Sequence, residues 1–149
     1  MIADHPFAPD EKLNIIAHSH GGNVALAASH LGLAHPIDTL ITLNKSTLLR
    51  DAYMPGPNIE RFYNISAARD WMQWAASGAK MPWSFAKDKN AINHTIDTSA
   101  SSIKPHAALI WDDAFREVWW EWFQIQHRAR AGSEAGSLVR SDPKAVPRA

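Results

Sequence analysis

A serine that lies between two histidines and before two glycines, in the run Ile-Ile-Ala-His-Ser-His-Gly-Gly, is the residue here best suited to covalent chemistry. The hydroxyl of a serine is a weak nucleophile until a histidine accepts its proton. A carboxylate is then needed to hold that imidazole in the correct tautomer. Ser19 therefore directs attention to the histidines and acidic residues that follow it along the chain.

Ser19 lies where a predicted strand meets a predicted helix. The short apolar run from Leu13 to Ala17 indicates a buried strand. The alanine-rich segment from Gly21 to Leu31 has apolar residues at helical spacing, and Gly32 follows it as an expected C-terminal cap. A serine in so sharp a turn has a strained backbone and an exposed hydroxyl. This arrangement is a nucleophile elbow.

The elbow places requirements on its neighbours. The residues two before and two after the serine are expected to be small, because neighbouring backbone passes close to the turn, and here they are Ala17 and Gly21. The N-terminus of the following helix favours negative charge that develops near Ser19. The backbone N–H of His20 is therefore the expected donor of an oxyanion hole.

The stretch from Leu13 to Leu26 resembles the elbow region of the α/β-hydrolase superfamily, particularly its lipase and esterase members. The family usually has glycine where this chain has Ala17. The resemblance covers about Leu13 to Phe123 and implies that residues 1–130 are the C-terminal portion of an α/β-hydrolase domain. It implies a partial α/β-hydrolase fold, with a mostly parallel sheet of about four strands and flanking helices. It also implies that the catalytic residues follow in the order Ser, Asp, His.

The acid of such a triad is expected after the predicted strand Arg61–Ile65, and Asp70 stands there. A second interpretation is that Asp70 caps the helix that begins near Trp71, and the two roles can coexist. Asp88 and Asp97 are the weaker alternatives.

The base is expected after the last strand and before the last helix, where His106 lies. His94 falls inside a predicted strand, and His127 lies at the far end of the predicted last helix, so both fit the role less well. The predicted triad is Ser19 as nucleophile, His106 as general base and acid, and Asp70 as the orienting carboxylate.

The rest of the chain alternates strands and helices, which favours a parallel sheet with covered faces. The further strands are expected at Thr39–Leu43 and Ala91–Ile96, and the segment from Trp71 to Trp83 is expected to be helix plus loop. A last helix is expected from Ala107 to about Arg128. Residues 131–149 are rich in Gly, Ser, Pro and charge, so we expect a disordered tail.

The predicted last helix carries an apolar stripe of large side chains at steps of three and four, namely Trp111, Phe115, Val118, Trp119 and Trp122. The stripe either packs on the sheet as core or forms an acyl-binding or lipid-facing surface. Trp120 lies off the stripe and is the better candidate for an exposed contact.

Composition limits the classes of function. Fifteen basic residues match fifteen acidic ones, so no net field draws the chain toward nucleic acid. The absence of cysteine excludes disulfides, thiol catalysis and thiolate metal sites. We expect no cofactor and no metal ion. No run is long and apolar enough for a transmembrane segment, and the N-terminus does not resemble a signal peptide, so a cytoplasmic location is the default expectation.

The resemblance also predicts strands that this sequence does not contain. The family has several strands before the elbow, and they supply a loop with the second oxyanion donor. Without them the strand Leu13–Ala17 would be a sheet edge with unpaired backbone. We expect that edge to be covered by a separately encoded N-terminal half, by self-association, or by residues encoded upstream of Met1.

The predicted function is hydrolysis of carboxylic esters, of small molecules or lipids, through an acyl-enzyme. One alternative is a catalytically weak remnant, or a subunit that needs a partner chain to supply the N-terminal strands. A less favoured alternative is a peptidase or amidase, because the same triad attacks amides.

Overall fold

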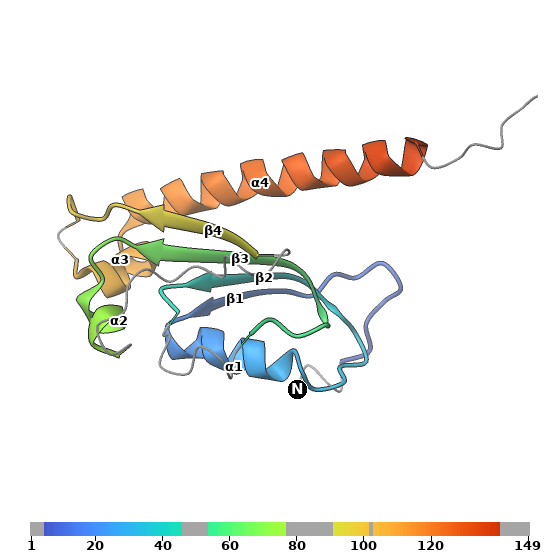
Figure 1. The fold of residues 1–149 in the computed structure, drawn as a ribbon, viewed down its shortest axis with the longest axis horizontal. Coiled ribbons are helices and arrows are strands. Elements are labelled where there is room, and N and C mark those ends of the chain that lie inside the picture. The colour runs from blue at the N-terminus through green and yellow to red at the C-terminus, as the bar shows by residue number, and fades with distance from the viewer. Residues whose placement is uncertain (1–4, 46–53, 77–90, 102, 141–149) are drawn as a thin grey trace, which may run out of the picture.

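The computed structural model of the protein describes residues 5–45, 54–76, 91–101 and 103–140 (Figure 1). Strands and helices alternate along most of this chain. In chain order they are β1 (Asn14–His18), α1 (His20–Ala28), β2 (Ile37–Leu43), β3 (Ile59–Ala67), α2 (Trp71–Ala76), β4 (Ala91–Ile96), α3 (Pro105–Trp111) and α4 (Asp113–Arg140).

The four strands form one sheet in the order β1-β2-β3-β4, and each strand is parallel to its neighbour. The predicted α/β class with about four mostly parallel strands is therefore confirmed. All four expected strands are present, and each of their ends lies within about two residues of the expected one. In a parallel sheet the carboxyl ends of all strands meet at one edge, so residues that follow different strands come together there.

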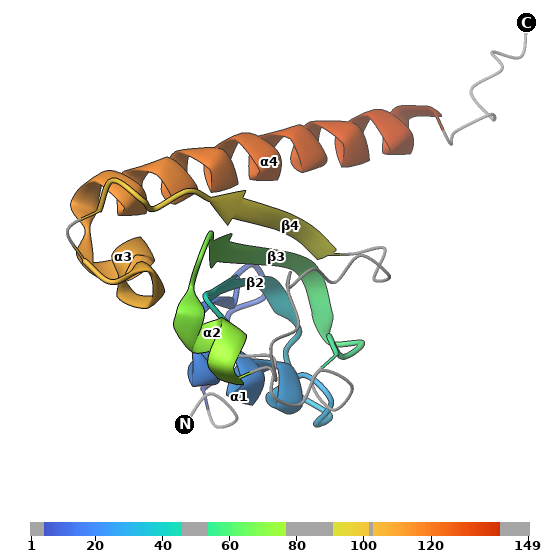
Figure 2. The same cartoon turned by 60° about the vertical axis from the view of Figure 1, so that its left-hand side comes forward.

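Helices α1 and α4 lie on opposite sides of the sheet (Figures 1 and 2). Buried side chains of the strands belong to two apolar clusters, one with residues of α1 and the other with residues of α3 and α4. Phe62 of β3 packs on the α1 side with Leu26. Its neighbour Tyr63 packs on the opposite side with Leu109 of α3 and Trp119 of α4. This alternation follows from the twofold period of a strand.

The last helix differs from its prediction. The chain leaves the helical conformation at Asp112 (φ −101°, ψ 111°), so α3 and α4 are separate helices. Trp111 ends α3 with 72% of its surface exposed, and Val118 is also exposed, so these two members of the stripe do not pack as core. Trp119 is buried, and its indole N–H donates to the carbonyl of Leu109 at 2.7 Å. This bond ties α4 to α3.

Two further boundaries, the ends of α1 and α4, differ from those expected from the sequence. The first helix stops at Ser29, whose hydroxyl donates to the carbonyl of Leu26 at 2.6 Å, so Gly32 is not its cap. Helix α4 continues to Arg140, into the segment expected to be disordered from residue 131. Residues 141–149 and the end of the segment expected up to Trp83 lie outside the described residues.

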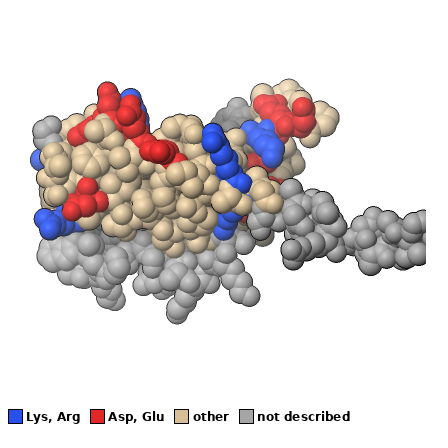
Figure 3. All heavy atoms as spheres, turned by 90° about the horizontal axis from the view of Figure 1, so that it is seen from above, with Lys and Arg blue, Asp and Glu red and all other residues tan. Residues whose placement is uncertain are grey.

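The surface seen in Figure 3 carries both signs of charge. Lys and Arg side chains and Asp and Glu side chains lie there in small groups, with uncharged surface between them. The described ion pairs include that of Arg116 with Asp113 at 2.8 Å.

The described part of the chain contains neither a candidate membrane span nor a candidate metal cluster. None of its helices is both long and apolar enough to cross a membrane. None of its histidine and acidic side chains gather in groups of three or more that could hold a metal ion.

Candidate active site

Ser19 follows β1 directly and has an unusual backbone, with φ 52° and ψ −125°. Its N–H donates to the carbonyl of Leu43 at 2.9 Å, which continues the pairing of β1 with β2 by one residue. Its carbonyl accepts a bond from Gly22 at 3.1 Å, in the first turn of α1. Hydrogen bonds to a strand on one side and to a helix on the other hold Ser19 in this strained turn.

His106 joins Ser19 to Asp70. Its Nε2 lies 2.9 Å from Oγ of Ser19, and its Nδ1 lies 2.7 Å from Oδ2 of Asp70. An ionised carboxylate only accepts hydrogen bonds, so Nδ1 carries the ring proton and Nε2 is left to accept the proton of the serine hydroxyl. The structure thus brings together all three residues of the predicted triad. It places His106 in the first turn of the short helix α3, whereas the sequence predicts a helix that begins only at Ala107.

Asp70 is almost fully buried, with 1% of its surface exposed. One carboxylate oxygen faces His106, and the other accepts the N–H of Met72 at 3.1 Å in the first turn of α2. Both roles considered for Asp70, partner of the base and cap of a helix, occur at once. The bond to Met72 fixes the carboxylate that orients the imidazole.

Backbone strain in the described chain is confined to the carboxyl edge of the sheet. The non-glycine residues with positive φ there are Ser19, Asn44 and Arg69, at 52°, 48° and 61°. They lie just beyond the ends of β1, β2 and β3 respectively. Arg69 immediately precedes Asp70, so two of the three are at or next to the triad. Strain of this kind gathers where a site must hold side chains in a set geometry.

Asn44 and His18 were not predicted as site residues, yet both contact His106. Nδ2 of Asn44 donates to the main-chain carbonyl of His106 at 2.8 Å, and Nε2 of His18 lies 2.9 Å from the same oxygen. Oδ1 of Asn44 accepts the N–H of Ala67, at the end of β3, at 2.6 Å. An asparagine directly after a buried strand is the signal that could have found the first of them.

The weaker candidates lie elsewhere. The ring of His94 stacks on that of Trp122 with centroids 4.4 Å apart, and burial lowers the pKa of His94. His127 lies against Phe123 on α4. Asp97 accepts the N–H of Ser99, which lowers the pKa of this carboxyl, and Asp88 is outside the described residues. The side chain that lies within hydrogen-bond distance of the Ser19 hydroxyl is His106, at 2.9 Å.

The N-terminus of α1 begins beside Ser19, with His20 as its first residue. The first N–H groups of a helix have no partner within it, so the N–H of His20 is available to a negative oxygen near Ser19. The segment before β1 lies at the opposite edge of the sheet. There the N–H of Leu13 donates to Asp38, near the start of β2, at 2.9 Å. Residues 5–13 therefore contact the amino edge of the sheet, away from Ser19.

The space around the two glycines corrects one expectation. A Cβ on Gly21 would meet nothing within 4 Å, whereas a Cβ on Gly22 would lie 3.1 Å from the side chain of Lys45 and 3.2 Å from that of Thr42. The residue that must be small is Gly22, and the close neighbours are side chains, not backbone.

This difference predicts opposite effects of two similar substitutions. Gly21→Ala should stabilise the protein by about 0.5–1 kcal/mol, because alanine favours a helix. Gly22→Ala should destabilise it by about 1–2 kcal/mol, because overpacking against Thr42 and Lys45 outweighs that gain. Urea unfolding followed by tryptophan fluorescence measures both changes. Equal shifts of the two variants in the same direction would contradict the packing described.

Lys45, which follows Asn44, is buried, and burial lowers its pKa from 10.5 to about 8. Between these pH values the unfolded chain holds a proton that the folded chain has released, so stability rises with pH. We expect the free energy of unfolding to increase from pH 8 to pH 10.5 by about 1–3 kcal/mol more in the wild type than in Lys45→Met. Urea titrations at the two pH values test this, and parallel pH profiles would refute it.

Comparisons of this chain with models of protein families, with curated proteins and with solved structures found no match.

Proposed function

We propose that this protein is a serine hydrolase of the α/β-hydrolase type that cleaves carboxylic esters. The observation that carries the proposal is the continuous chain of hydrogen bonds from Oγ of Ser19 through His106 to Asp70, at 2.9 and 2.7 Å. Its three members come from segments that follow three different strands, yet they meet at one edge of the sheet. A strained serine at the start of a helix adds to this support.

The proposed reaction has two halves. His106 Nε2 takes the proton of Ser19 as Oγ attacks the ester carbonyl carbon, and a tetrahedral intermediate forms. The bond to the leaving alcohol then breaks, and the imidazolium gives that alcohol its proton, which leaves an acyl-enzyme on Ser19. In the second half a water gives its proton to His106 and attacks the acyl carbon. Collapse of this second intermediate releases the carboxylic acid and returns the proton to Ser19.

Asp70 and His20 support these steps without exchanging a proton. The carboxylate of Asp70 holds the reactive tautomer and stabilises the imidazolium that forms twice in the cycle. The N–H of His20, at the positive end of α1, stabilises the oxyanion of each intermediate.

The expected weakness of this oxyanion site favours esters over amides as substrates. Loss of one oxyanion donor costs on the order of 100- to 1000-fold in rate. The described residues offer the N-terminus of α1 for this role, and residues 5–13 contact the other edge of the sheet. An activated ester has a better leaving group than an amide and tolerates a weaker oxyanion site. We therefore assign the protein to ester hydrolysis.

The test is to trap the acyl-enzyme. The protein is mixed with p-nitrophenyl butyrate, quenched in acid within the first turnovers and weighed by mass spectrometry. A butyryl adduct on the peptide that contains Ser19, with a matching early release of nitrophenol, is the expected result. Hydrolysis without any covalent adduct, or an adduct on another residue, would contradict the proposal.

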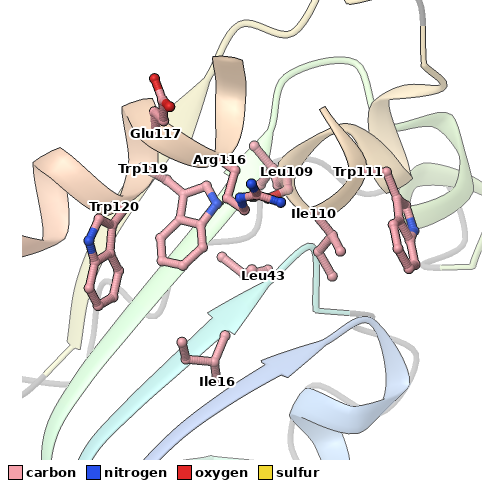
Figure 4. Close-up of a pocket in the computed structure, with 9 residues that line it drawn as sticks. All are labelled: Ile16, Leu43, Leu109, Ile110, Trp111, Arg116, Glu117, Trp119 and Trp120. Carbon is pink, nitrogen blue, oxygen red and sulfur yellow. Dashed lines mark hydrogen bonds between the residues drawn. The ribbon is translucent and has the colours of Figure 1, made fainter. Parts of the chain in front are cut away.

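A second candidate function is that of a subunit completed by another chain, and the edge of the sheet favours it. β1 pairs with β2 alone, and Ile16 at its centre has 54% of its surface exposed. Ile16 also lines a mainly apolar pocket of about 530 Å³, whose other walls include Leu43 of β2 and Trp120 of α4 (Figure 4). An edge strand beside an apolar hollow is a surface that an added strand can cover.

Sedimentation velocity over a range of protein concentrations tests this second candidate through self-association. Association that Ile16→Lys weakens is the expected result, because a charge on an edge strand opposes strand addition. Asn14→Lys places the same charge at the start of β1, away from the pocket, and serves as a milder control. A wild-type chain that stays monomeric at high concentration and is fully active would contradict this second candidate and support the first.

A further inference from the structure

The main-chain carbonyl of His106 is held by two side chains that come from two different strand ends. His18 is the last residue of β1 and lies immediately before Ser19. Asn44 follows β2. Their nitrogens lie 2.9 and 2.8 Å from the same carbonyl oxygen, and Asn44 also donates to the carbonyl of Pro105 at 3.2 Å. A carbonyl oxygen has two lone pairs, so it can accept both bonds at once.

Asn44 uses both ends of its amide. Its Nδ2 holds His106, while its Oδ1 accepts the N–H of Ala67, the last residue of β3. Its own N–H donates to Ile65 of β3 at 2.9 Å. The chain that leaves β3 at Ala67 reaches Asp70 after one short turn. Asn44 thus connects the segment that carries the acid to the helix that carries the base.

The conformation of Asn44 is itself a cost that these bonds offset. Its φ is 48°, in the left-handed region, and no part of its surface is exposed. Asparagine tolerates this region better than most residues, but it still costs free energy there. A buried amide is stable only when its hydrogen bonds are made. The strained backbone and the satisfied amide together fix one orientation of the side chain.

The side chain of His18 also forms a hydrogen bond with the main-chain carbonyl of His106. A carbonyl oxygen cannot donate, so the bond requires the tautomer with a proton on Nε2. The rings of His18 and His106 lie 4.9 Å apart at an angle of 50°. The residue before the nucleophile therefore contacts the backbone of the base, while the base contacts the nucleophile through its ring.

We propose that Asn44 and His18 are positioning residues that fix the place of the His106 imidazole through hydrogen bonds to its main-chain carbonyl. The inference rests on the proposed serine hydrolase function. The hydrogen bonds described for these two side chains all go to backbone groups. They act through the carbonyl, so that the imidazole lies between Ser19 and Asp70 before substrate binds. Misplacement of a catalytic group by about 1 Å can cost on the order of 100-fold in rate.

Four variants separate the donor from other roles of these side chains. Asn44→Asp keeps an acceptor for Ala67 but replaces the donor toward His106 with a carboxylate oxygen. His18→Leu removes the donor of His18, and His18→Gln restores an amide donor there. The double variant His18→Leu/Asn44→Asp leaves the carbonyl with neither side-chain donor.

The far end of α1 offers matched controls. Asn58 donates from Nδ2 to two carbonyls, those of Ser29 at 3.1 Å and Leu31 at 3.0 Å. Nε2 of His30 lies 2.7 Å from the carbonyl of Met54. Asn58→Asp and His30→Leu remove hydrogen bonds of the same chemistry, and these bonds do not involve the triad.

Steady-state hydrolysis of p-nitrophenyl butyrate is the first measurement. Asn44→Asp is expected to lower kcat about 10- to 100-fold with KM changed less than about threefold, because the base is displaced while the substrate surface is kept. His18→Leu should lower kcat about 10-fold, and His18→Gln should recover most of this loss. Each donor partly compensates for the other, so the double variant should lose more than the product of the single losses. The two controls should keep kcat.

Proton NMR of the His106 ring is the second measurement, and it does not depend on turnover. The Nδ1 proton shared with Asp70 is expected to give a low-field signal in the wild type, Asn58→Asp and His30→Leu. It should shift or broaden in Asn44→Asp and His18→Leu. The proposal is overturned if this signal is unchanged in both single variants, or if kcat falls equally in the controls. A shifted signal in a protein without Ser19-dependent activity would keep the positioning role and reject the proposed function. His18 is only half-buried, so its variants keep the test valid if Asn44→Asp fails to fold.

Discussion

Ser19→Ala is expected to lower kcat for p-nitrophenyl butyrate on the order of 10⁴- to 10⁶-fold, the largest effect of any single substitution in this protein. The reason is that the variant has no atom to form the acyl-enzyme, whereas His106 and Asp70 keep their 2.7 Å contact. Residual hydrolysis would then come from the N-terminus of α1 and from substrate binding. Initial rates at saturating substrate, corrected for spontaneous hydrolysis, measure the change.

The control for this loss is Ser99→Ala. Ser99 is an exposed serine whose N–H bonds to Asp97 beyond the end of β4, away from the triad. This variant should keep the wild-type kcat, and thermal unfolding should show that both variants are folded. Ser19→Ala with more than a tenth of the wild-type kcat would show that the measured hydrolysis does not use Ser19.

Asp70→Asn is expected to lower kcat about 10⁴-fold while it preserves the fold. The asparagine keeps an oxygen to accept the N–H of Met72, a bond of 3.1 Å in the wild type. Its amide nitrogen, however, cannot accept the Nδ1 proton of His106. The imidazole then favours the other tautomer, with the proton on Nε2, and can no longer accept the proton of Ser19.

The pH dependence distinguishes this explanation from simple loss of stability. At high pH hydroxide can replace the missing base, so the rate of Asp70→Asn should rise more steeply with pH than that of the wild type. Asp70→Ala also loses the cap of α2, so it should be less stable than Asp70→Asn by about 1 kcal/mol. If Asp70→Asn keeps kcat within about tenfold, Asp70 only caps a helix and the acid lies elsewhere.

The triad could be proposed from the sequence because the elbow resembles that of α/β-hydrolases, and this resemblance implies an acid and a histidine after later strands. Ser19 stands between an apolar run and an alanine-rich helix, and Asp70 and His106 each follow a later strand. In a parallel sheet these positions converge, so a correct list of strands suffices to bring them together.

The residues that hold the triad could not be proposed in the same way. Asn44 and His18 contact a main-chain carbonyl, 62 and 88 residues away in the chain, and no periodicity links such pairs. The sequence indicates only that His18 flanks Ser19 in the elbow. The need for a small residue was likewise assigned to Gly21, because the motif counts positions, whereas the contact with Lys45 falls on Gly22.

The C-terminal helices show a different limit of prediction from the sequence. Apolar residues continue at helical spacing past Asp112, so the pattern predicts one helix, although the backbone at Asp112 is extended and starts a second one. Gly132 and its polar neighbours predict disorder from composition, yet they continue α4 to Arg140. Composition measures how little a segment can bury, and it does not measure how far an existing helix can extend from a packed end.

The most direct test of the central claim is to map where a fluorophosphonate reacts. The proposed triad predicts one adduct per folded chain, on the peptide that contains Ser19, with no labelling of Ser19→Ala and much slower labelling of His106→Ala. A label on another residue, equal labelling of Ser19→Ala, or labelling of the folded wild type no faster than that of the urea-unfolded chain would contradict it.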